Sequence, residues 1–169
     1  MGIVHNPPIT EKGWHGSETR IKIMPSDFIQ NDDYNRGTIQ VAYDAGIAGG
    51  VGFGLEVSNS SLEVYAGVPI PTGYKATGLK IAGTDTANKI WAWEACVVGC
   101  ALINLFDDTG LISLMGANKF VGTEYDFDGA DGTGANELTS GVTNYLLVWV
   151  ELEATTDVCY GGYVNIEKV

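Results

Sequence analysis

Histidine is scarce in this chain, and its scarcity limits the chemistry that the chain can carry. Only His5 and His15 occur among 169 residues, both in an amino-terminal stretch that also holds prolines and glycines. Histidine is the usual general base near neutral pH, so a Ser-His-Asp or Cys-His set would have to borrow one of these two residues. We therefore expect no enzyme and assign no catalytic residues.

Basic residues are also few. Nine lysines and arginines face 21 aspartates and glutamates, which gives a formal net charge of −12. Such a surface repels phosphate backbones and anionic membranes, so we expect no nucleic-acid partner and no membrane association. The longest apolar run, 90–103, is interrupted by Glu94 and is shorter than the roughly 20 residues of a membrane helix. The amino terminus has no cationic leader followed by an apolar stretch, so no signal peptide is expected.

Cysteine occurs three times, at Cys96, Cys100 and Cys159. An odd count does not form a secreted disulfide framework, so production in a reducing compartment is expected, with the cysteines as buried free thiols. The Cys-x-x-x-Cys spacing lacks the close pairing of zinc sites and has no histidine nearby. We predict no metal or cofactor bound by these residues.

Glycine, in contrast, is abundant, with 23 residues, and it favours tight turns over helix interiors. Short alternating segments separated by turn residues predict many strands and no amphipathic helix. We therefore predict an all-β fold: a single β-sandwich or jelly-roll-like domain over 20–169, preceded by an extended amino-terminal arm over 1–19. The expected strands cover residues 20–24, 38–43, 55–57, 62–66, 74–82, 89–98, 111–115, 120–127, 144–153 and 158–166.

Two long segments are expected to form hairpins and to contribute most to the core, 68–98 and 146–166. In the first, Trp91 and Trp93 are two residues apart, which places both rings on one face of a strand. Packing in the core or at a subunit interface is the favoured interpretation, and stacking on sugars is the alternative. Glu94 interrupts this apolar strand and is expected to face solvent or a subunit contact.

Acidic and glycine-rich segments offer two further hypotheses. Glu124, Asp126, Asp128 and Asp131 bring four carboxylates into eight residues, which could hold calcium or could be the solvated face of a strand end. The glycine-dense segment 44–54 has no Lys-Ser or Lys-Thr after its glycines, so a close-packed strand or connection is favoured over a phosphate loop. Paired carboxylates leave a polysaccharide-degrading enzyme as a weaker alternative.

Three segments resemble small all-β virion proteins of tailed bacteriophages, of the kind found on the outside of the head. They are RIKIMPSDFI (20–29), PIPTGYKATGLKIAGTDT (69–86) and TNYLLVWVELEATTDVCYGGYVNI (143–166), which together cover roughly 30% of the chain. Similar segments also occur in phage tail and fibre proteins. The resemblance implies a structural role on the virion, often as a trimer, in which a sandwich domain sits on the shell.

From these features we predict a virion structural protein, most of all a capsid decoration (cement) protein. It would be made in the host cytoplasm and located on the capsid surface. Its partners would be the major capsid protein and further copies of itself in a homotrimer. The alternative is a carbohydrate- or host-receptor-binding module of a phage fibre or tail.

Overall fold

The protein is all-β in the part of the chain that the computed structural model describes, residues 19–30, 37–44, 52–96, 112–113, 119–127 and 137–169. Within these ranges the strands form two antiparallel sheets, and the only helical element is the 3-10 turn η1 (Pro25–Asp27). The predicted fold class is thus confirmed at the level of an all-β protein with two sheets. The expected arm, 1–19, lies outside the described residues except for Thr19.

The first sheet has seven strands and runs in the order β10-β6-β13-β4-β3, with β1 added to β13 and β11 to β6. Its centre is the long antiparallel pair of β6 and β13, in which Val164 lies opposite Leu79. Its strands are β1 (Arg20–Ile23), β3 (Ile39–Asp44), β4 (Gly52–Val57), β6 (Tyr74–Gly83), β10 (Glu124–Asp126), β11 (Leu138–Thr139) and β13 (Val158–Lys168).

The second sheet has six strands and runs in the order β2-β5-β12-β7-β8, with β9 added to β7. Strand β12 is central, because β5 pairs with one edge of it and β7 with the other over nearly its full length. Its strands are β2 (Ile29–Gln30), β5 (Leu62–Val68), β7 (Lys89–Cys96), β8 (Ile112–Ser113), β9 (Lys119–Phe120) and β12 (Asn144–Leu152).

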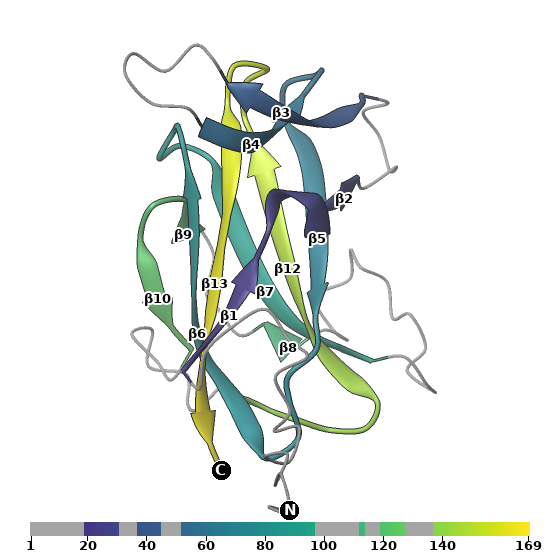
Figure 1. The fold of residues 1–169 in the computed structure, drawn as a ribbon, viewed down its shortest axis with the longest axis vertical. Coiled ribbons are helices and arrows are strands. Elements are labelled where there is room, and N and C mark those ends of the chain that lie inside the picture. Colours follow the sequence, from purple (N-terminus) through teal and green to yellow (C-terminus); the bar gives the residue numbers. More distant parts are fainter. Residues whose placement is uncertain (1–18, 31–36, 45–51, 97–111, 114–118, 128–136) are drawn as a thin grey trace, which may run out of the picture.

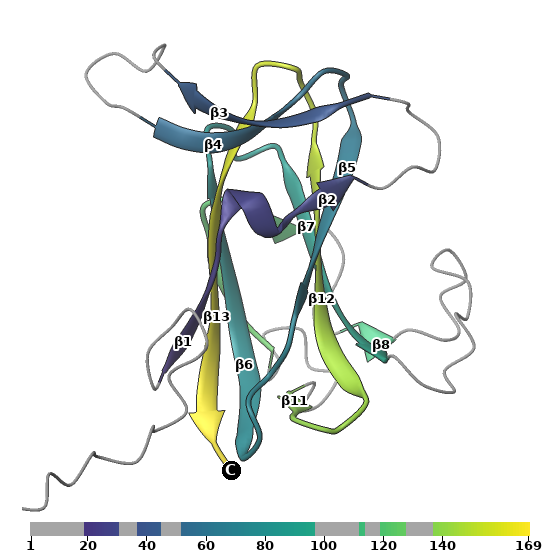
Figure 2. The same cartoon turned by 45° about the vertical axis from the view of Figure 1, so that its right-hand side comes forward.

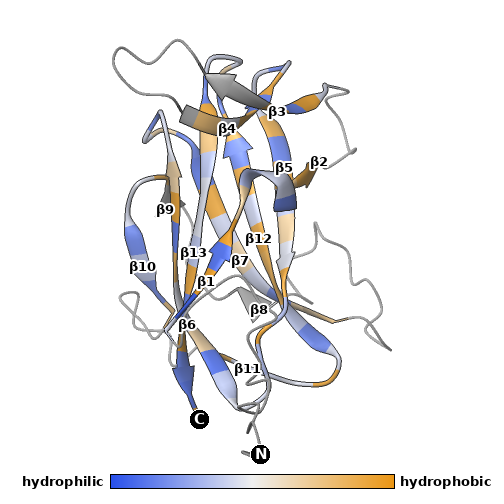
Figure 3. Cartoon of the chain, in the orientation of Figure 1, coloured by the Kyte–Doolittle hydropathy of each residue, from blue (hydrophilic) through white to orange (hydrophobic). Residues whose placement is uncertain are grey.

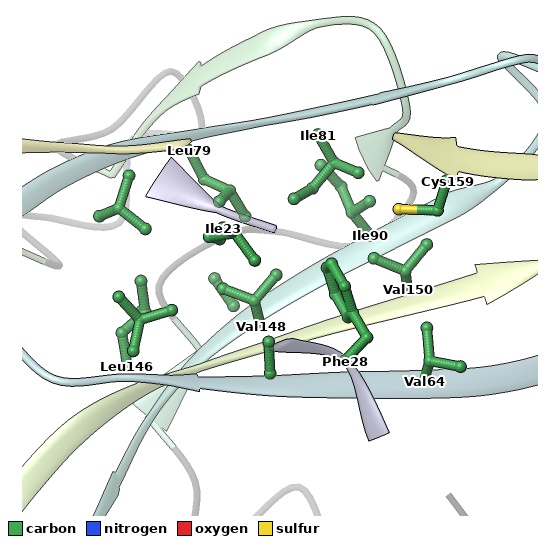
Figure 4. Close-up of a cluster of buried hydrophobic side chains, with 14 of the residues drawn as sticks. Ile23, Phe28, Val64, Leu79, Ile81, Ile90, Leu146, Val148, Val150 and Cys159 are labelled. Atoms are coloured by element: carbon green, nitrogen blue, oxygen red, sulfur yellow. The ribbon is translucent and has the colours of Figure 1, made fainter. Parts of the chain in front are cut away.

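The two sheets face each other across one hydrophobic core (Figures 1 and 2). Leu79 and Ile81 of the first sheet and Ile90, Val148 and Val150 of the second are fully buried there. Their side chains point toward one another in Figure 4. Hydrophobic and hydrophilic residues alternate along the strands in Figure 3, as expected when one face of a sheet is buried and the other is not.

The two predicted hairpins are wrong as pairings. Strand β6 lies in the first sheet and β7 in the second, and likewise β12 lies in the second sheet and β13 in the first. Each connection therefore carries the chain across the core from one sheet to the other. A local pattern of apolar residues is the same for a strand that pairs with its neighbour and for one that faces it, so sequence pattern could not separate the two.

The two crossing connections are bonded to each other at one end of the sheets. Asn88, fully buried between β6 and β7, accepts a hydrogen bond at Oδ1 from the backbone N–H of Glu153, at 2.9 Å. Thr84 accepts at Oγ1 from the backbone N–H of Val158, also at 2.9 Å, and donates its own N–H to the Val158 carbonyl. Backbone groups that a hairpin would pair with one another are satisfied here between two loops.

The predicted strand 120–127 is divided between the sheets. Strand β9 pairs with β7 of the second sheet, whereas β10 pairs with β6 of the first. Gly122 lies between them with φ of +92°, a conformation that favours glycine, and its N–H donates to the Ile81 carbonyl. Polar and apolar residues alternate after Gly122 as in a strand, so the pattern did not indicate this turn. Strand β11 lies outside the expected strands.

Candidate functional site

The outer face of the second sheet is unusually aromatic. Across the three central strands, Tyr65 lies opposite Trp149, and Trp149 lies opposite Trp91. On the same face, Trp93 lies one pair further along, opposite Leu147, and Tyr145 lies beyond it, opposite Ala95. We call these five residues the aromatic face: Tyr65, Trp91, Trp93, Tyr145 and Trp149. The sequence expectation that Trp91 and Trp93 share one face is confirmed, and they lie on the side away from the core.

Three indole rings form a compact group within this face. The rings of Trp91 and Trp93 are within 7° of parallel, with centroids 6.3 Å apart. Trp149 contacts both at a tilt of about 50°, with centroids at 5.7 Å from Trp91 and 5.1 Å from Trp93. Trp149 is only 9% exposed, whereas Trp91 and Trp93 are partly exposed. Trp149 thus supports the two outer rings from the central strand.

Two further residues complete the packing of the aromatic face. Leu147 is 8% exposed yet is not a member of the core cluster, which places its side chain on the outer surface beside Trp93. The ring of Tyr145 lies over Gly67, close enough that a Cβ added there would be 3.4 Å from it. Because Gly67 has no side chain, Tyr145 can lean across the neighbouring strand.

A charged row borders the aromatic face on the same side of the sheet. Lys89 lies opposite Glu151, two residues from Trp91 and Trp149. Its Nζ donates to Glu153 at 2.6 Å and to Glu151 at 3.5 Å. The hydrogen bond to Glu153 raises the pKa of the Lys89 amine. We call Lys89, Glu151 and Glu153 the charged row; it places hydrogen-bonding groups directly beside the indoles.

The outer face of the first sheet is polar and bonded to itself. Glu124 accepts hydrogen bonds from Asn165 Nδ2 at 2.7 Å and from the Tyr163 hydroxyl at 2.8 Å, which lower the pKa of the Glu124 carboxyl. Arg20 lies over the Tyr163 ring, 4.1 Å from its centroid, and donates from Nε to Asn165 Oδ1. The bond to Glu124 in turn raises the pKa of Tyr163. We call these four residues the polar face.

A third surface is formed where the β3–β4 hairpin crosses one end of the sheets (Figures 1 and 2). On β4, Leu55 and Val57 face the core and are buried, but Phe53 on the same face is 57% exposed. On β3, Ile39 packs against the core while Val41 is 39% exposed. One face of the hairpin therefore holds apolar side chains that are buried in the core at one part and exposed to solvent at another.

Two more exposed apolar side chains lie on neighbouring segments. Met24, just before η1, is 42% exposed, and Ile29 of β2 is 53% exposed, whereas Phe28 beside it is buried. The 3-10 turn lies against β4, and in both views η1, β2, β3 and β4 occupy the same half of the molecule. We call Met24, Val41 and Phe53 the apolar end surface; Ile29 lies opposite Tyr65 and therefore borders the aromatic face.

The predicted acidic set is only partly described. Glu124 is committed to the polar face, Asp126 is exposed, and Asp128 and Asp131 lie outside the described residues. Among the described residues, no group of three or more His, Cys, Asp and Glu side chains is placed to hold a metal ion. Glu94 is half-buried and accepts a hydrogen bond from Asn144 Nδ2 at 2.9 Å, so it is bound within its own sheet.

The cysteines divide into two kinds. Cys159 is buried and free, as predicted, and burial raises the pKa of its thiol to about 11. Cys96 takes part in a disulfide, so the expectation of a free thiol is wrong for it.

Cys100, His5 and His15 lie outside the described residues, as does most of the glycine-dense segment 44–54. Gly54 at its end packs so closely on Val158 that a Cβ there would be 2.2 Å from Cγ1, in accord with a close-packed strand.

Comparisons with known proteins return no relative: no family model, no curated protein and no solved structure matches the chain. Within the described ranges, none of the helical structure has the length and apolar character needed to cross a bilayer. The three surfaces described above are therefore the features on which a functional argument can be built.

Proposed function

We propose that this chain is a virion structural protein, a capsid decoration protein that binds the outer surface of a phage head and reinforces contacts between capsid subunits. Its partners are the major capsid protein and two further copies of the chain in a trimer. The role is structural and involves no catalysis. We also propose that the two sheets form a jelly roll, because the long strands β5, β6 and β7, and again β12 and β13, alternate between the sheets.

The observation that carries this proposal is the apolar end surface. Exposed apolar side chains are common singly, but Val41 and Phe53 extend a face that is buried core elsewhere on the same hairpin. Covering such a face with another protein removes apolar area from water, which gains about 25 cal/mol of free energy per Å² buried. A neighbouring subunit provides that cover, whereas the strongly acidic body, with net charge −12, keeps the protein away from packaged DNA.

Three segments resemble head-surface proteins of tailed phages, and for this reason we propose the major capsid protein as the partner. One of these segments, RIKIMPSDFI, contains Met24 of the apolar end surface. Another, 143–166, contains β12 and most of β13, central strands of the two sheets. The resemblance includes tail and fibre proteins as well, so the position on the virion is the first quantity to measure.

Immunogold labelling of intact virions with an antibody to this chain measures that position. We expect label over the head of the encoding phage. Label confined to the tail or fibres would overturn the decoration role and favour the receptor-binding alternative, and absence of label from particles that contain all other structural proteins would overturn both.

A pair of matched variants tests the surface itself. Phe53→Asp places a charge on the apolar end surface, and Val142→Asp places the same charge at a fully exposed valine outside it. Purified empty heads should bind the wild-type chain and Val142→Asp in co-sedimentation, while Phe53→Asp should lose at least tenfold in affinity. Analytical ultracentrifugation of the same three proteins measures whether the trimer depends on this surface. Equal binding by all three proteins would remove the apolar end surface from the proposal.

A further inference from the structure

The aromatic face has a different chemistry from the apolar end surface. It consists of indole and phenol rings, which carry N–H and O–H groups. Two of them, Trp91 and Trp93, are partly exposed and nearly parallel. Indole faces carry partial negative charge, which attracts the slightly positive C–H groups on the flat side of a pyranose ring. The two indoles are two residues apart on one strand and stack on each other, so each keeps one ring face turned away from the other, against which such a ring can stack.

The surroundings of the indoles add the second requirement for binding a sugar. The charged row lies on the same side of the sheet, and its side chains remain partly exposed: 33% for Lys89, 17% for Glu151 and 35% for Glu153. Carboxylates accept hydrogen bonds from hydroxyl groups, and an ammonium group donates to them. A hydroxylated ligand can therefore stack on the rings and hydrogen-bond beside them without removing the ion pairs from water.

The same row disfavours a large protein partner on this face. A protein that covered the indoles would also bury Lys89 and its two carboxylates, and taking such charges out of water costs several kcal/mol per ion before any gain. Charge also restricts the class of glycan. With Glu151 and Glu153 beside the indoles and −12 on the whole chain, an acidic polysaccharide is repelled, while a neutral one is not.

We propose that the aromatic face binds a neutral polysaccharide built of hexopyranose units. Trp91 and Trp93 provide the stacking surface, Trp149 holds both indoles in place, and the charged row bonds the hydroxyl groups of the sugar. Because Trp149 is buried and contacts both rings, the stacking surface exists before the ligand arrives, which reduces the entropy lost on binding. This binding does not depend on whether the chain is attached to the head or to the tail.

Tryptophan fluorescence tests the proposal directly, since three of the four tryptophans of the chain lie in the aromatic face. The full chain is titrated with soluble neutral polysaccharides, a β-glucan, a mannan and a galactan, and with alginate as an acidic one. We expect a saturable change in emission with at least one neutral polymer and none with alginate. Affinity electrophoresis in gels containing the same polymers provides an independent measure of binding.

The variants separate the aromatic face from the rest of the protein. Trp91→Ala and Trp93→Ala should each weaken binding at least tenfold, whereas Tyr163→Ala, which removes an aromatic ring from the outer face of the other sheet, should leave it unchanged. If a tryptophan variant fails to fold, oxidation of the folded wild-type chain by N-bromosuccinimide replaces it: bound glycan should slow the modification of Trp91 and Trp93, as read by peptide mass spectrometry.

Three results would overturn the proposal. The first is the absence of binding to every neutral polymer at saturating concentration. The second is binding that persists in folded Trp91→Ala and Trp93→Ala. The third is loss of binding to purified heads, rather than to glycan, in these two variants, which would make the aromatic face a protein interface. The variants of the apolar end surface, Phe53→Asp and Val142→Asp, should bind glycan as the wild type does, so the two proposals can fail separately.

Discussion

The outer faces of the two sheets differ in chemistry: one holds polar side chains that bond to one another, and the other holds partly exposed aromatic rings. On the first sheet, Glu124 and Asn165 bond to each other and to Tyr163 and Arg20, so the polar groups satisfy one another and the rest face water. On the second sheet, the corresponding positions hold indole and phenol rings beside a short charged row. A face whose groups are already paired has little to gain from a ligand, whereas an aromatic face that is half-exposed gains by being covered.

The largest expected effect distinguishes the inner from the outer face of β12. Leu146 is fully buried in the core and Leu147, its neighbour in sequence, lies on the aromatic face. We expect Leu146→Ala to lower the free energy of unfolding by about 2–5 kcal/mol. Leu147→Ala should lower it by about 1–2 kcal/mol, because its neighbours can close over the gap. Urea unfolding measures both, and equal losses would contradict the assignment of the two faces.

A smaller effect is expected from the outer indoles. Trp91→Ala or Trp93→Ala should reduce the free energy of unfolding by about 1–3 kcal/mol, since each ring makes two aromatic contacts but is only partly buried. Close, tilted indole pairs also couple electronically, and each single variant leaves one tilted pair with Trp149. The far-ultraviolet couplet in circular dichroism should therefore weaken in each variant and disappear in the double variant Trp91→Ala/Trp93→Ala. Trp14→Phe, which changes the tryptophan outside the aromatic face, is the control. A couplet of wild-type amplitude in the double variant would contradict the ring arrangement.

The polar face should respond to pH. Hydrogen bonds from Asn165 and Tyr163 lower the pKa of Glu124, so the folded state binds this proton less readily than the unfolded chain does. The stabilisation is therefore fully present above the ordinary glutamate pKa and is lost as the pH falls through the lowered value in the folded state. Carboxyl carbon NMR should show the pKa of Glu124 rising in Asn165→Leu, and rising less in Tyr163→Phe. Equal values in wild type and Asn165→Leu would refute the assigned bond.

The smallest effect is expected at the edge of the polar face. Arg20 and Glu124 approach to 3.8 Å, but their side chains are 51% and 39% exposed. Exposed ion pairs of this kind contribute little to stability and are screened by salt. Arg20→Met should leave the thermal midpoint unchanged within error in 0.5 M salt, a concentration at which the Debye length is well under 10 Å. A fall of several degrees at that salt concentration would show that the polar face carries more stability than its exposure indicates.

Functional residues were found unevenly by sequence reasoning. The spacing of Trp91 and Trp93 was sufficient to place them on one face, but Trp149 and Tyr65 join them only through the pairing of β12 with β7 and β5. The apolar end surface was missed, because Val41 follows the same alternating pattern as a buried residue. The position of Phe53 beyond the opposing sheet is a property of the hairpin's length and direction, which no local pattern records.

Local chemistry alone was enough to predict an all-β protein, the approximate positions of most long strands and the burial of Cys159, because alternation of apolar residues and turn residues act over a few positions. Which strands pair was decided by the tertiary structure. The chain crosses between sheets after β1, β2, β4, β5, β6, β9, β11 and β12. Buried Asn88 and exposed Thr84 bond loops that are some 65–74 residues apart in sequence. Contacts at such separation depend on the whole fold, so the two outer faces, and the surfaces proposed to bind protein and glycan, exist only once both sheets have assembled.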